Sequence, residues 1–274
     1  MVKLRPVIFL SALLVIGWHA VSYPMVGGTV VGNGDTFKKH MVGIYNVADG
    51  GVCTGTLIRQ DVVLTAAHCF DTSDNPEDYI ALFGLAISQE KDTKSVPVAA
   101  IRIPSMYNPR KNKRNSNFDI ALMKLASAAP GGYTPADVAT KTDGFPVDDE
   151  TYITAGYGVT KLRKNDPGIL RMLAPRSAEF SLSGQGRYIE LKPSGAGPCR
   201  GDSGSPLFKV ARDSAGNISY SVIGVQSQAI QRAVNGKFTR EFCEDVGLYT
   251  NLPIYSRWLE WSVNLPDWNA AREW

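Results

Sequence analysis

The sequence predicts an all-β fold, either a sandwich or a barrel. Its apolar runs are only three to six residues long and are bounded by turn residues, and the 274 residues include 26 glycines and 16 prolines. Short β-branched or aliphatic runs of this kind favour many short strands over alternating strand–helix units. No repeat of fixed period is present. The expected strands include Val62–Leu64, Tyr79–Leu82, Val98–Ile103, Ile120–Leu122, Tyr152–Thr154 and Tyr220–Val225.

The N-terminal segment has the pattern of an export signal. Lys3 and Arg5 precede an apolar stretch, Pro6–Gly17, which is too short to span a bilayer with margin. Residues 20–22 (Ala-Val-Ser) form a small-x-small cleavage site. We therefore expect residues 1–22 to be a signal peptide and the mature protein to be secreted, extracellular or periplasmic, with no membrane partner.

The charges of the chain are nearly balanced. The formal net charge is +3, and removing Lys3 and Arg5 from the 29 basic residues leaves 27 against 26 acidic residues. Nucleic-acid-binding domains are typically far more basic, so we expect no nucleic-acid partner.

The cysteines favour two disulfides. An even number of cysteines in an exported chain is typical of disulfide bonds rather than a metal site, and three pairings are possible. Counting alone leaves a zinc site of four thiolates open, but no CxxC spacing is present. We therefore expect no metal and no cofactor. The cysteines are Cys53, Cys69, Cys199 and Cys243.

Residues 198–207, PCRGDSGSPL, place Ser203 between two glycines and directly after an aspartate. A serine hydroxyl is a poor nucleophile until a base removes its proton, and histidine is the usual base near neutral pH. His68, in LTAAHC, fits this role, and Asp119, in FDIALMKL, fits the carboxylate that holds the imidazole in one tautomer. Gly201 and Gly204 leave the backbone around the serine open, so that N–H groups can face an oxyanion.

A different serine motif, G-x-S-x-G, would indicate an α/β-hydrolase. The position that would need the second glycine is Ser205, so the motif is incomplete. In that fold the serine also comes first along the chain, whereas here the order is His68, Asp119, Ser203. We therefore exclude this fold.

The segments LTAAHC, FDIAL and PCRGDSGSPL, in that order, resemble the motifs of the chymotrypsin/trypsin-like serine proteases. GGVCTGTLI, AGYG, VIGVQS and GLYTNLPIYSRWLEW extend the likeness over about residues 25–261. The resemblance implies two antiparallel six-stranded β-barrels, over residues 25–130 and 131–274. The second part would include a helix near Ile254–Val263 and a tail whose docking site stays open.

The resemblance also implies a role for each residue of the site. His68 would be the general base, Asp119 the carboxylate that orients it, and Ser203 the nucleophile that forms an acyl-enzyme. The backbone amides of Gly201 and Ser203 would form the oxyanion hole, and Ser227 would hydrogen-bond Asp119. The implied activity is that of a serine endopeptidase.

The carboxylate before the serine, Asp202, would pair with a new N-terminal amine. Met25 occupies the matching terminus, where relatives commonly have isoleucine or valine, and its thioether can fill an apolar slot. Relatives are usually cut after a basic residue, whereas Met25 follows residues 23–24, Tyr-Pro. We expect these two residues to be a short pro-dipeptide that a dipeptidyl peptidase removes.

The same resemblance pairs Cys53 with Cys69 and Cys199 with Cys243. The first disulfide would hold the histidine loop, and the second would tie the serine loop to the wall of the specificity pocket. A calcium loop is not expected, because Leu85 stands where calcium-binding relatives have a glutamate.

The implied substrate pocket has no charged residue at its base. Trypsin-like members have an aspartate six residues before the serine, and that position here is Gly197. An unpaired lysine or arginine is costly to bury, so we expect a neutral, apolar residue at P1, before the cleaved bond. An acidic P1 is the alternative, because Arg200 lies at the rim and Arg232, Lys237 and Arg240 follow in a long insertion. The other pocket positions are Pro198, Ser227, Gln228, Ala229 and Gly247.

Two other functions remain alternatives. One is a catalytically inactive binding protein of the same fold, which the presence of all three catalytic residue types disfavours. The other is a narrow processing protease or an esterase with the same machinery, since a fold does not define a substrate. The expected partners are protein or peptide substrates and a protein inhibitor of proteases, and the expected state is a monomer.

Overall fold

The computed structural model describes residues 25–89, 91, 93–108, 118–140, 150–176, 179–192, 195–231, 233–234, 237–238 and 242–268. The predicted leader and dipeptide (1–24), the side chains of the insertion at 232–242 and residues 269–274 of the tail lie outside the described residues.

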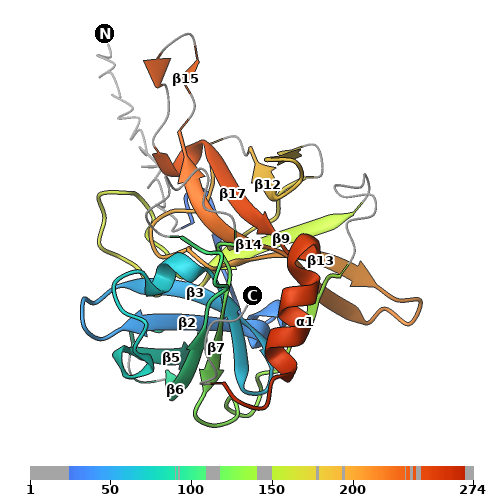
Figure 1. Cartoon of the computed structure of the whole chain (residues 1–274). Helices are drawn as coiled ribbons and strands as arrows, with labels where there is room; N and C mark the ends of the chain where they lie inside the picture. The colour runs from blue at the N-terminus through green and yellow to red at the C-terminus, as the bar shows by residue number, and fades with distance from the viewer. Residues whose placement is uncertain are drawn as a thin grey trace, which may run out of the picture.

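The first half of the chain forms a closed six-stranded barrel (Figure 1). All of its strand pairs are antiparallel, in the order β2-β3-β4-β7-β6-β5. Side chains alternate between exposed and buried along β6, and Val96, Val98 and Ala100 are its buried apolar positions. The strands are β2 (Met41–Asn46), β3 (Val52–Arg59), β4 (Val62–Thr65), β5 (Tyr79–Phe83), β6 (Lys94–Arg102) and β7 (Ala121–Leu125).

The second half forms a nine-stranded sheet rather than the expected closed six-stranded barrel. Its hydrogen-bonded path runs β1-β10-β9-β13-β14-β17-β12-β11, with β8 parallel to β14, and the path does not close within the described residues. Two-residue strands from the N-terminal segment and the linker add to this sheet, which changes its strand count. The strands are β1 (Thr29–Val30), β8 (Asp137–Val138), β9 (Thr151–Gly156), β10 (Arg171–Leu173), β11 (Phe180–Ser183), β12 (Tyr188–Leu191), β13 (Pro206–Arg212), β14 (Ile218–Ile230) and β17 (Val246–Asn251).

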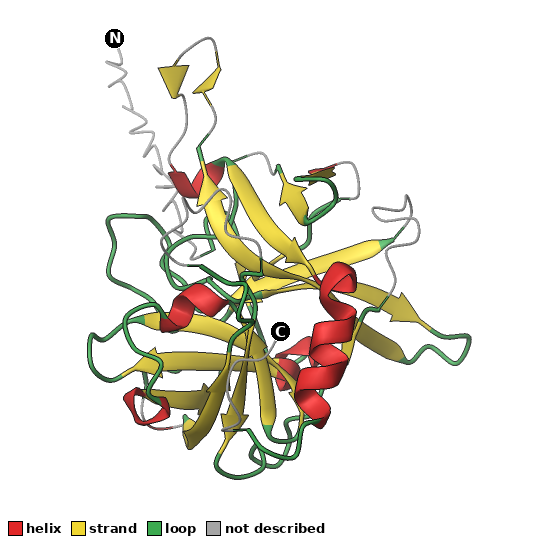
Figure 2. Cartoon of the chain, viewed as in Figure 1, coloured by secondary structure: helices red, strands yellow, loops and turns green. Residues whose placement is uncertain are grey.

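Short helices and one hairpin complete the described chain (Figure 2). The all-β, trypsin-like fold class predicted from the sequence is confirmed. In the described residues α1 (Ser256–Asn264) is the single α-helix, close to the expected bounds, and it buries Trp258, Leu259 and Ser262. The other elements are the 3₁₀ helices η1 (Thr36–His40), η2 (Ala67–Phe70), η3 (Pro76–Asp78), η7 (Phe242–Glu244) and η8 (Leu252–Tyr255), and the hairpin β15 (Ala233–Val234) and β16 (Lys237–Phe238).

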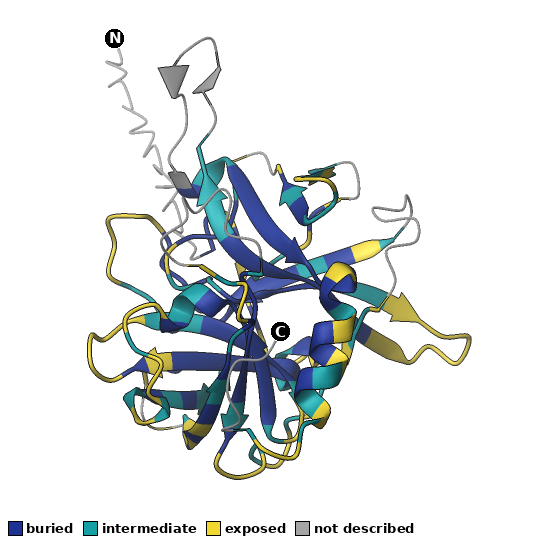
Figure 3. Ribbon diagram, viewed as in Figure 1, coloured by how far each residue is buried: buried dark blue, intermediate teal, exposed yellow. Residues whose placement is uncertain are grey.

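One hydrophobic cluster joins the two halves. Phe37 of η1 packs against Phe208 of β13 and Tyr220 of β14, with ring centroids 6.4 and 6.1 Å apart. The same cluster includes Leu64 of the barrel and Trp258 of α1. Figure 3 shows that buried segments run through both strand layers, while exposed residues gather at outer loops and the β13–β14 hairpin. No helix among the described residues is long and apolar enough to cross a bilayer.

The chain after α1 docks on the first barrel, through a buried arginine of β6. Arg102 is 8% exposed and donates hydrogen bonds to the carbonyls of Ser262 and Asp267. Its guanidinium also lies over the ring of Trp268, 4.6 Å from the centroid. The Ser262 carbonyl is in the last turn of α1, where helix carbonyls lack intrahelical partners, so Arg102 caps the helix.

We expect Arg102→Met to lower the free energy of unfolding by about 2–3 kcal/mol, because two carbonyls lose a charged donor. Urea unfolding measures the change. Arg59→Met is the matched control, since exposed Arg59 also bonds the end of this helix, at Asn264 Oδ1, and should cost about 0.5 kcal/mol or less. Equal effects of the two substitutions would contradict the capping role.

Candidate active site

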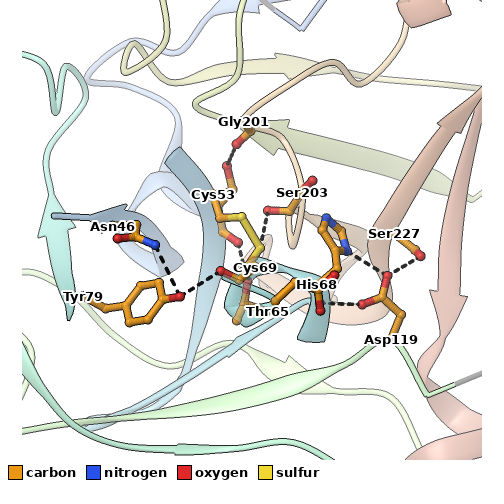
Figure 4. The surroundings of a disulfide bond; sticks show 12 residues. Asn46, Cys53, Thr65, His68, Cys69, Tyr79, Asp119, Gly201, Ser203 and Ser227 are labelled. Atoms are coloured by element: carbon orange, nitrogen blue, oxygen red, sulfur yellow. Dashed lines mark hydrogen bonds and ion pairs between the residues drawn. A yellow bond between two sulfur atoms is a disulfide. The ribbon is translucent and has the colours of Figure 1, made fainter. Parts of the chain in front are cut away.

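His68 is positioned by a strand end and a disulfide. The apolar strand β4 ends at Thr65, and the chain turns into η2, which contains His68 and Cys69. Cys69 is bonded to Cys53 of β3, which pairs with β4. The histidine loop is thereby tied to two adjacent strands (Figure 4). The second disulfide joins Cys199 to Cys243, so both pairs are those that the resemblance implies.

Asp119 lies two residues before the start of β7 and is 1% exposed. Its Oδ1 accepts the backbone N–H of His68 at 3.0 Å, and its Oδ2 lies 2.9 Å from His68 Nδ1. Ser227 Oγ also donates to Oδ2. Burial alone would raise the pKa of Asp119, but the His68 imidazole and these hydrogen bonds hold that pKa below its usual value. The carboxylate is therefore ionised and holds the proton of His68 on Nδ1.

Ser227 reaches Asp119 because of an irregularity in β14. The register between β14 and β17 shifts between Gln226 and Gln228, so Ser227 is the bulged residue. A bulge re-aims a side chain that regular pairing would point elsewhere. Asp119 is also held through its backbone, since Thr250 Oγ1 donates to the Asp119 carbonyl at 3.1 Å.

Ser203 lies on a tight loop between the barrel and the second sheet. Gly201 and Gly204 have φ values of +95° and +83°, which favour glycine. A Cβ at Gly204 would lie 2.0 Å from Thr65 Oγ1. The Ser203 carbonyl accepts the Thr54 N–H at 2.8 Å. Figure 4 shows Ser203 beside the His68 imidazole, on the side of the ring away from Asp119.

The loop leaves two backbone N–H groups beside Ser203 without a protein partner among the described residues. The Arg200 carbonyl accepts the N–H of Val159 at 2.8 Å, and the Asp202 carbonyl accepts that of Ser205 at 2.9 Å. In a trans peptide the following N–H points the opposite way, so the amides of Gly201 and Ser203 turn away from these partners. Within the described part of the chain neither amide donates to another protein group. They are available to an oxyanion.

Asp202 is fully buried in a cradle of backbone. Its carboxylate accepts the N–H of Gly158 and the N–H of Cys199, both at 2.8 Å. A Cβ at Gly156 or Gly158 would lie 2.2 or 2.5 Å from this carboxylate, so only glycine leaves room for it. Burial raises the pKa of Asp202 to about 7, although the two N–H donors and the charge of Arg171 limit the rise.

The N-terminal segment lies against the pocket but is not bonded to Asp202. Met25 is 0% exposed, and Val26 forms an antiparallel bridge with Gly197. Met25 is joined to Pro24, so its nitrogen is a peptide nitrogen and not an amine. Among the described residues, no hydrogen bond or ion pair connects Met25 with Asp202. Of the expected site residues, the structure brings His68, Asp119, Ser203 and Ser227 together. Met25 is buried next to Val26, which bridges to Gly197, and it is not bonded to Asp202.

The expected pocket residues meet at the end of β14 and β17. Ala229 pairs with Gly247 across these strands, and a Cβ at Gly247 would lie 2.9 Å from the Pro198 ring. Gly197 and Pro198 are buried, while Gln228 and Ala229 are half-buried and Arg200 is exposed. Among the described residues, those expected at the base of the pocket are therefore small and uncharged, and the cationic Arg200 is exposed.

Sequence reasoning missed two threonines of the site, Thr54, which supports the serine loop, and Thr250, which holds the backbone of Asp119. Thr54 Oγ1 donates to the Gly201 carbonyl at 2.9 Å and accepts the Tyr157 N–H at 3.1 Å. Thr54 lies in GGVCTGTLI and Thr250 in GLYTN, both inside segments that carry the family resemblance. Their strand positions alone gave no signal, because their partners are more than a hundred residues away in sequence.

The comparisons with known proteins agree with this geometry. A family model described as Trypsin matches residues 25–259. The chain is 25% identical to chymotrypsin-like elastase family member 1 of Macaca fascicularis, over 95% of the chain and 98% of that protein. It is 28% identical to transmembrane protease serine 11C of Mus musculus, over 76% of the chain and 47% of that protein. The chain thus matches about half the length of the second relative.

The raised pKa of Asp202 predicts a pH dependence of stability. Between pH 3.8, the usual pKa, and about 7 the folded state binds more protons than the unfolded state, so stability falls as pH rises through this window. We expect Asp202→Asn to reduce this fall in a chain that keeps the residues before Met25. Urea unfolding at several pH values in a Ser203→Ala background, which prevents self-digestion, measures it. The same slope with and without Asp202 would contradict the assignment.

Proposed function

The chain belongs to the trypsin family and is a serine endopeptidase, and we propose that Ser203, His68 and Asp119 perform its chemistry. The supporting observation is the position of the imidazole. Its Nδ1 faces the ionised carboxylate of Asp119, and its other side faces Ser203 (Figure 4). This is the arrangement in which an imidazole can take a proton from the hydroxyl and pass it to a leaving amine.

The proposed reaction proceeds in two halves. Ser203 Oγ attacks the substrate carbonyl while His68 takes its proton, and the amides of Gly201 and Ser203 bind the resulting oxyanion. His68 then donates the proton to the leaving amine, and an acyl-enzyme remains. Water, activated by the same imidazole, hydrolyses the acyl-enzyme and restores Ser203. Asp119 stabilises the imidazolium in both halves because it stays ionised.

The proposed mature chain begins at Met25, with its amine paired to Asp202. Support comes from the burial of both residues and from the bridge between Val26 and Gly197, which brings this segment to the pocket. An ammonium beside Asp202 would compensate the buried charge that the two N–H donors leave uncompensated. Removal of the Tyr23-Pro24 dipeptide by a dipeptidyl peptidase would free this amine.

The proposed specificity is for a neutral, apolar P1 residue. The small, uncharged base formed by Gly197, Pro198 and Gly247 supports it, because a buried lysine or arginine would have no carboxylate partner there. An acidic P1 is the second candidate, on the single observation that Arg200 is exposed at the rim.

The surroundings of the enzyme are also proposals. As a protease of this family the chain acts on protein substrates. The leader-like residues 1–22 support export to the extracellular space or periplasm. We further propose that the mature chain is monomeric and binds a protein protease inhibitor at the same cleft. The geometry around His68 disfavours an inactive binding protein.

A fluorophosphonate probe tests the nucleophile. We expect the probe to label the wild-type protein and to leave Ser203→Ala unlabelled, because only an activated serine reacts. Peptide hydrolysis should fall by a factor on the order of 10⁶ in the same variant. Ser205→Ala, a buried serine on the same loop, is the control and should still be labelled. Labelling of Ser203→Ala would disprove the assignment.

A peptide library tests the pocket. We expect cleavage after apolar residues to exceed cleavage after lysine or arginine by about a hundredfold or more, the cost of burying an unpaired cation. Mass spectrometry of the products identifies P1. Arg200→Gln separates the two candidates: it should hardly alter cleavage after apolar residues, and a selective loss of cleavage after Asp or Glu would support the acidic alternative instead.

A further inference from the structure

A second charged side chain lies beside the Asp202 cradle. Arg171, on β10, is 8% exposed, and it pairs with Gly156 of β9. Directly paired residues of antiparallel strands project from the same face of the sheet, with Cβ atoms about 5 Å apart. A Cβ at Gly156 would lie 2.2 Å from Asp202 Oδ1. Arg171 therefore projects from the face of the sheet that holds this carboxylate.

We propose that Arg171 is a positioning residue that supplies positive charge to Asp202 in the uncut chain, so that the oxyanion hole is formed before Met25 becomes a terminus. The inference rests on the proposed function, because it concerns the same Ser203 loop. It assigns to the uncut chain an activity of its own, lower than or equal to that of the chain that begins at Met25.

Among the described residues, the guanidinium of Arg171 is not hydrogen-bonded to a carboxylate. Nη1 donates to the Ile169 carbonyl at 3.2 Å, and Nε has no partner within the described residues. Burying a guanidinium with no carboxylate in contact is destabilising, and interaction with acidic groups farther away offsets part of this cost. Two carboxylates lie near enough to interact with its charge, that of Asp166 and, more weakly, that of Asp202.

The charge of Arg171 acts more strongly on Asp166, but of the two carboxylates Asp202 is the one with fewer other partners. Asp166 is half-buried, and Thr160 already donates to both of its oxygens, from the backbone N–H and from Oγ1. Asp202 is fully buried and has only two neutral N–H donors. Arg171 is not within ion-pair distance of Asp202, but a charge acts over longer distances in a buried region than in water.

Two further observations support a role in the uncut chain. The amides of Gly201 and Ser203 already turn away from Val159 and Ser205, and among the described residues they donate to no protein group, while Met25 is still bonded to Pro24. The residues before Met25 are Tyr23-Pro24, and no lysine or arginine stands there for a protease of trypsin-like specificity to cut after. An internal cation makes the loop independent of such a cut.

The test compares two forms of the protein, one beginning at Tyr23 and one at Met25. Each is prepared as wild type, Arg171→Gln, Arg171→Lys and Arg176→Gln. Arg176 is an exposed arginine in the same segment, 82% accessible at its side chain, and is the matched control. N-terminal sequencing verifies that each form is intact. The rate of fluorophosphonate labelling and the kcat and KM for a peptide are measured.

In the Tyr23 form we expect labelling of the wild type and a loss of about tenfold or more in Arg171→Gln, since an opposite charge shifts a buried carboxyl by a pKa unit or more. The loss should be in kcat, because the oxyanion hole acts in the transition state. Arg171→Lys should recover part of it. In the Met25 form the labelling rate and kcat of Arg171→Gln should stay within about threefold of wild type, because the free amine replaces the charge of Arg171. That result would also show that the variant folds.

Three results would overturn the inference. The first is equal labelling of wild type and Arg171→Gln in the Tyr23 form. The second is an unlabelled Tyr23 wild type beside a labelled Met25 wild type, which leaves the proposed function intact and removes only the role of Arg171. The third is the absence of labelling in the wild type of both forms, which removes the proposed function and the inference together.

Discussion

The burial of Asp119 is the constraint on which the rest of the site depends. An ionised carboxylate is stable in a protein interior only if charged or hydrogen-bonding partners replace its water. The partners of the carboxylate are His68 of η2 and Ser227 of β14, and Thr250 of β17 donates to the backbone carbonyl of the same residue. The barrel and the second sheet therefore have to meet at one point for this single residue to be buried. The same meeting point brings Ser203 to the imidazole.

The two buried aspartates of the site show opposite responses to burial. The pKa of Asp119 is held below its usual value, because the imidazole of His68, which can carry a positive charge, together with the hydrogen bonds to the carboxylate outweighs the effect of burial. Asp202 has neutral N–H donors only, and its pKa rises to about 7. The Asp119 carboxylate thus has an ionisable partner within hydrogen-bond distance, whereas among the described residues that of Asp202 has none, and the more distant charge of Arg171 only limits the rise in its pKa. This asymmetry makes the Ser203 loop, and not the His68 pair, the part of the site that a cation can regulate.

The fold class could be predicted from the sequence because short contiguous motifs carry the family resemblance, and that resemblance also implied the disulfide pairs and the roles proposed for His68, Asp119 and Ser203. It did not predict the nine-stranded second sheet or the docking of the tail on Arg102, which depend on pairings between distant segments. Arg171 was missed for the same reason. In the sequence it is one arginine in ILRML, and only its pairing with Gly156 places it beside Asp202. The sequence of one strand alone does not determine its register with a neighbouring strand.

The N-terminal segment contacts only one side of the catalytic cleft. Val26 bridges to Gly197, and a Cβ at Gly27 would lie 2.7 Å from Ala196, so this segment supports the chain that leads into the serine loop. The hydrogen bonds that hold the Asp119 carboxylate, by contrast, come from His68 and Ser227 and, among the described residues, from no atom of this segment. A change at the N-terminus can therefore alter the pocket and the oxyanion hole while the base stays in place. Control of the enzyme by its terminus would act on transition-state binding and substrate fit, and proton transfer by His68 would remain ready throughout.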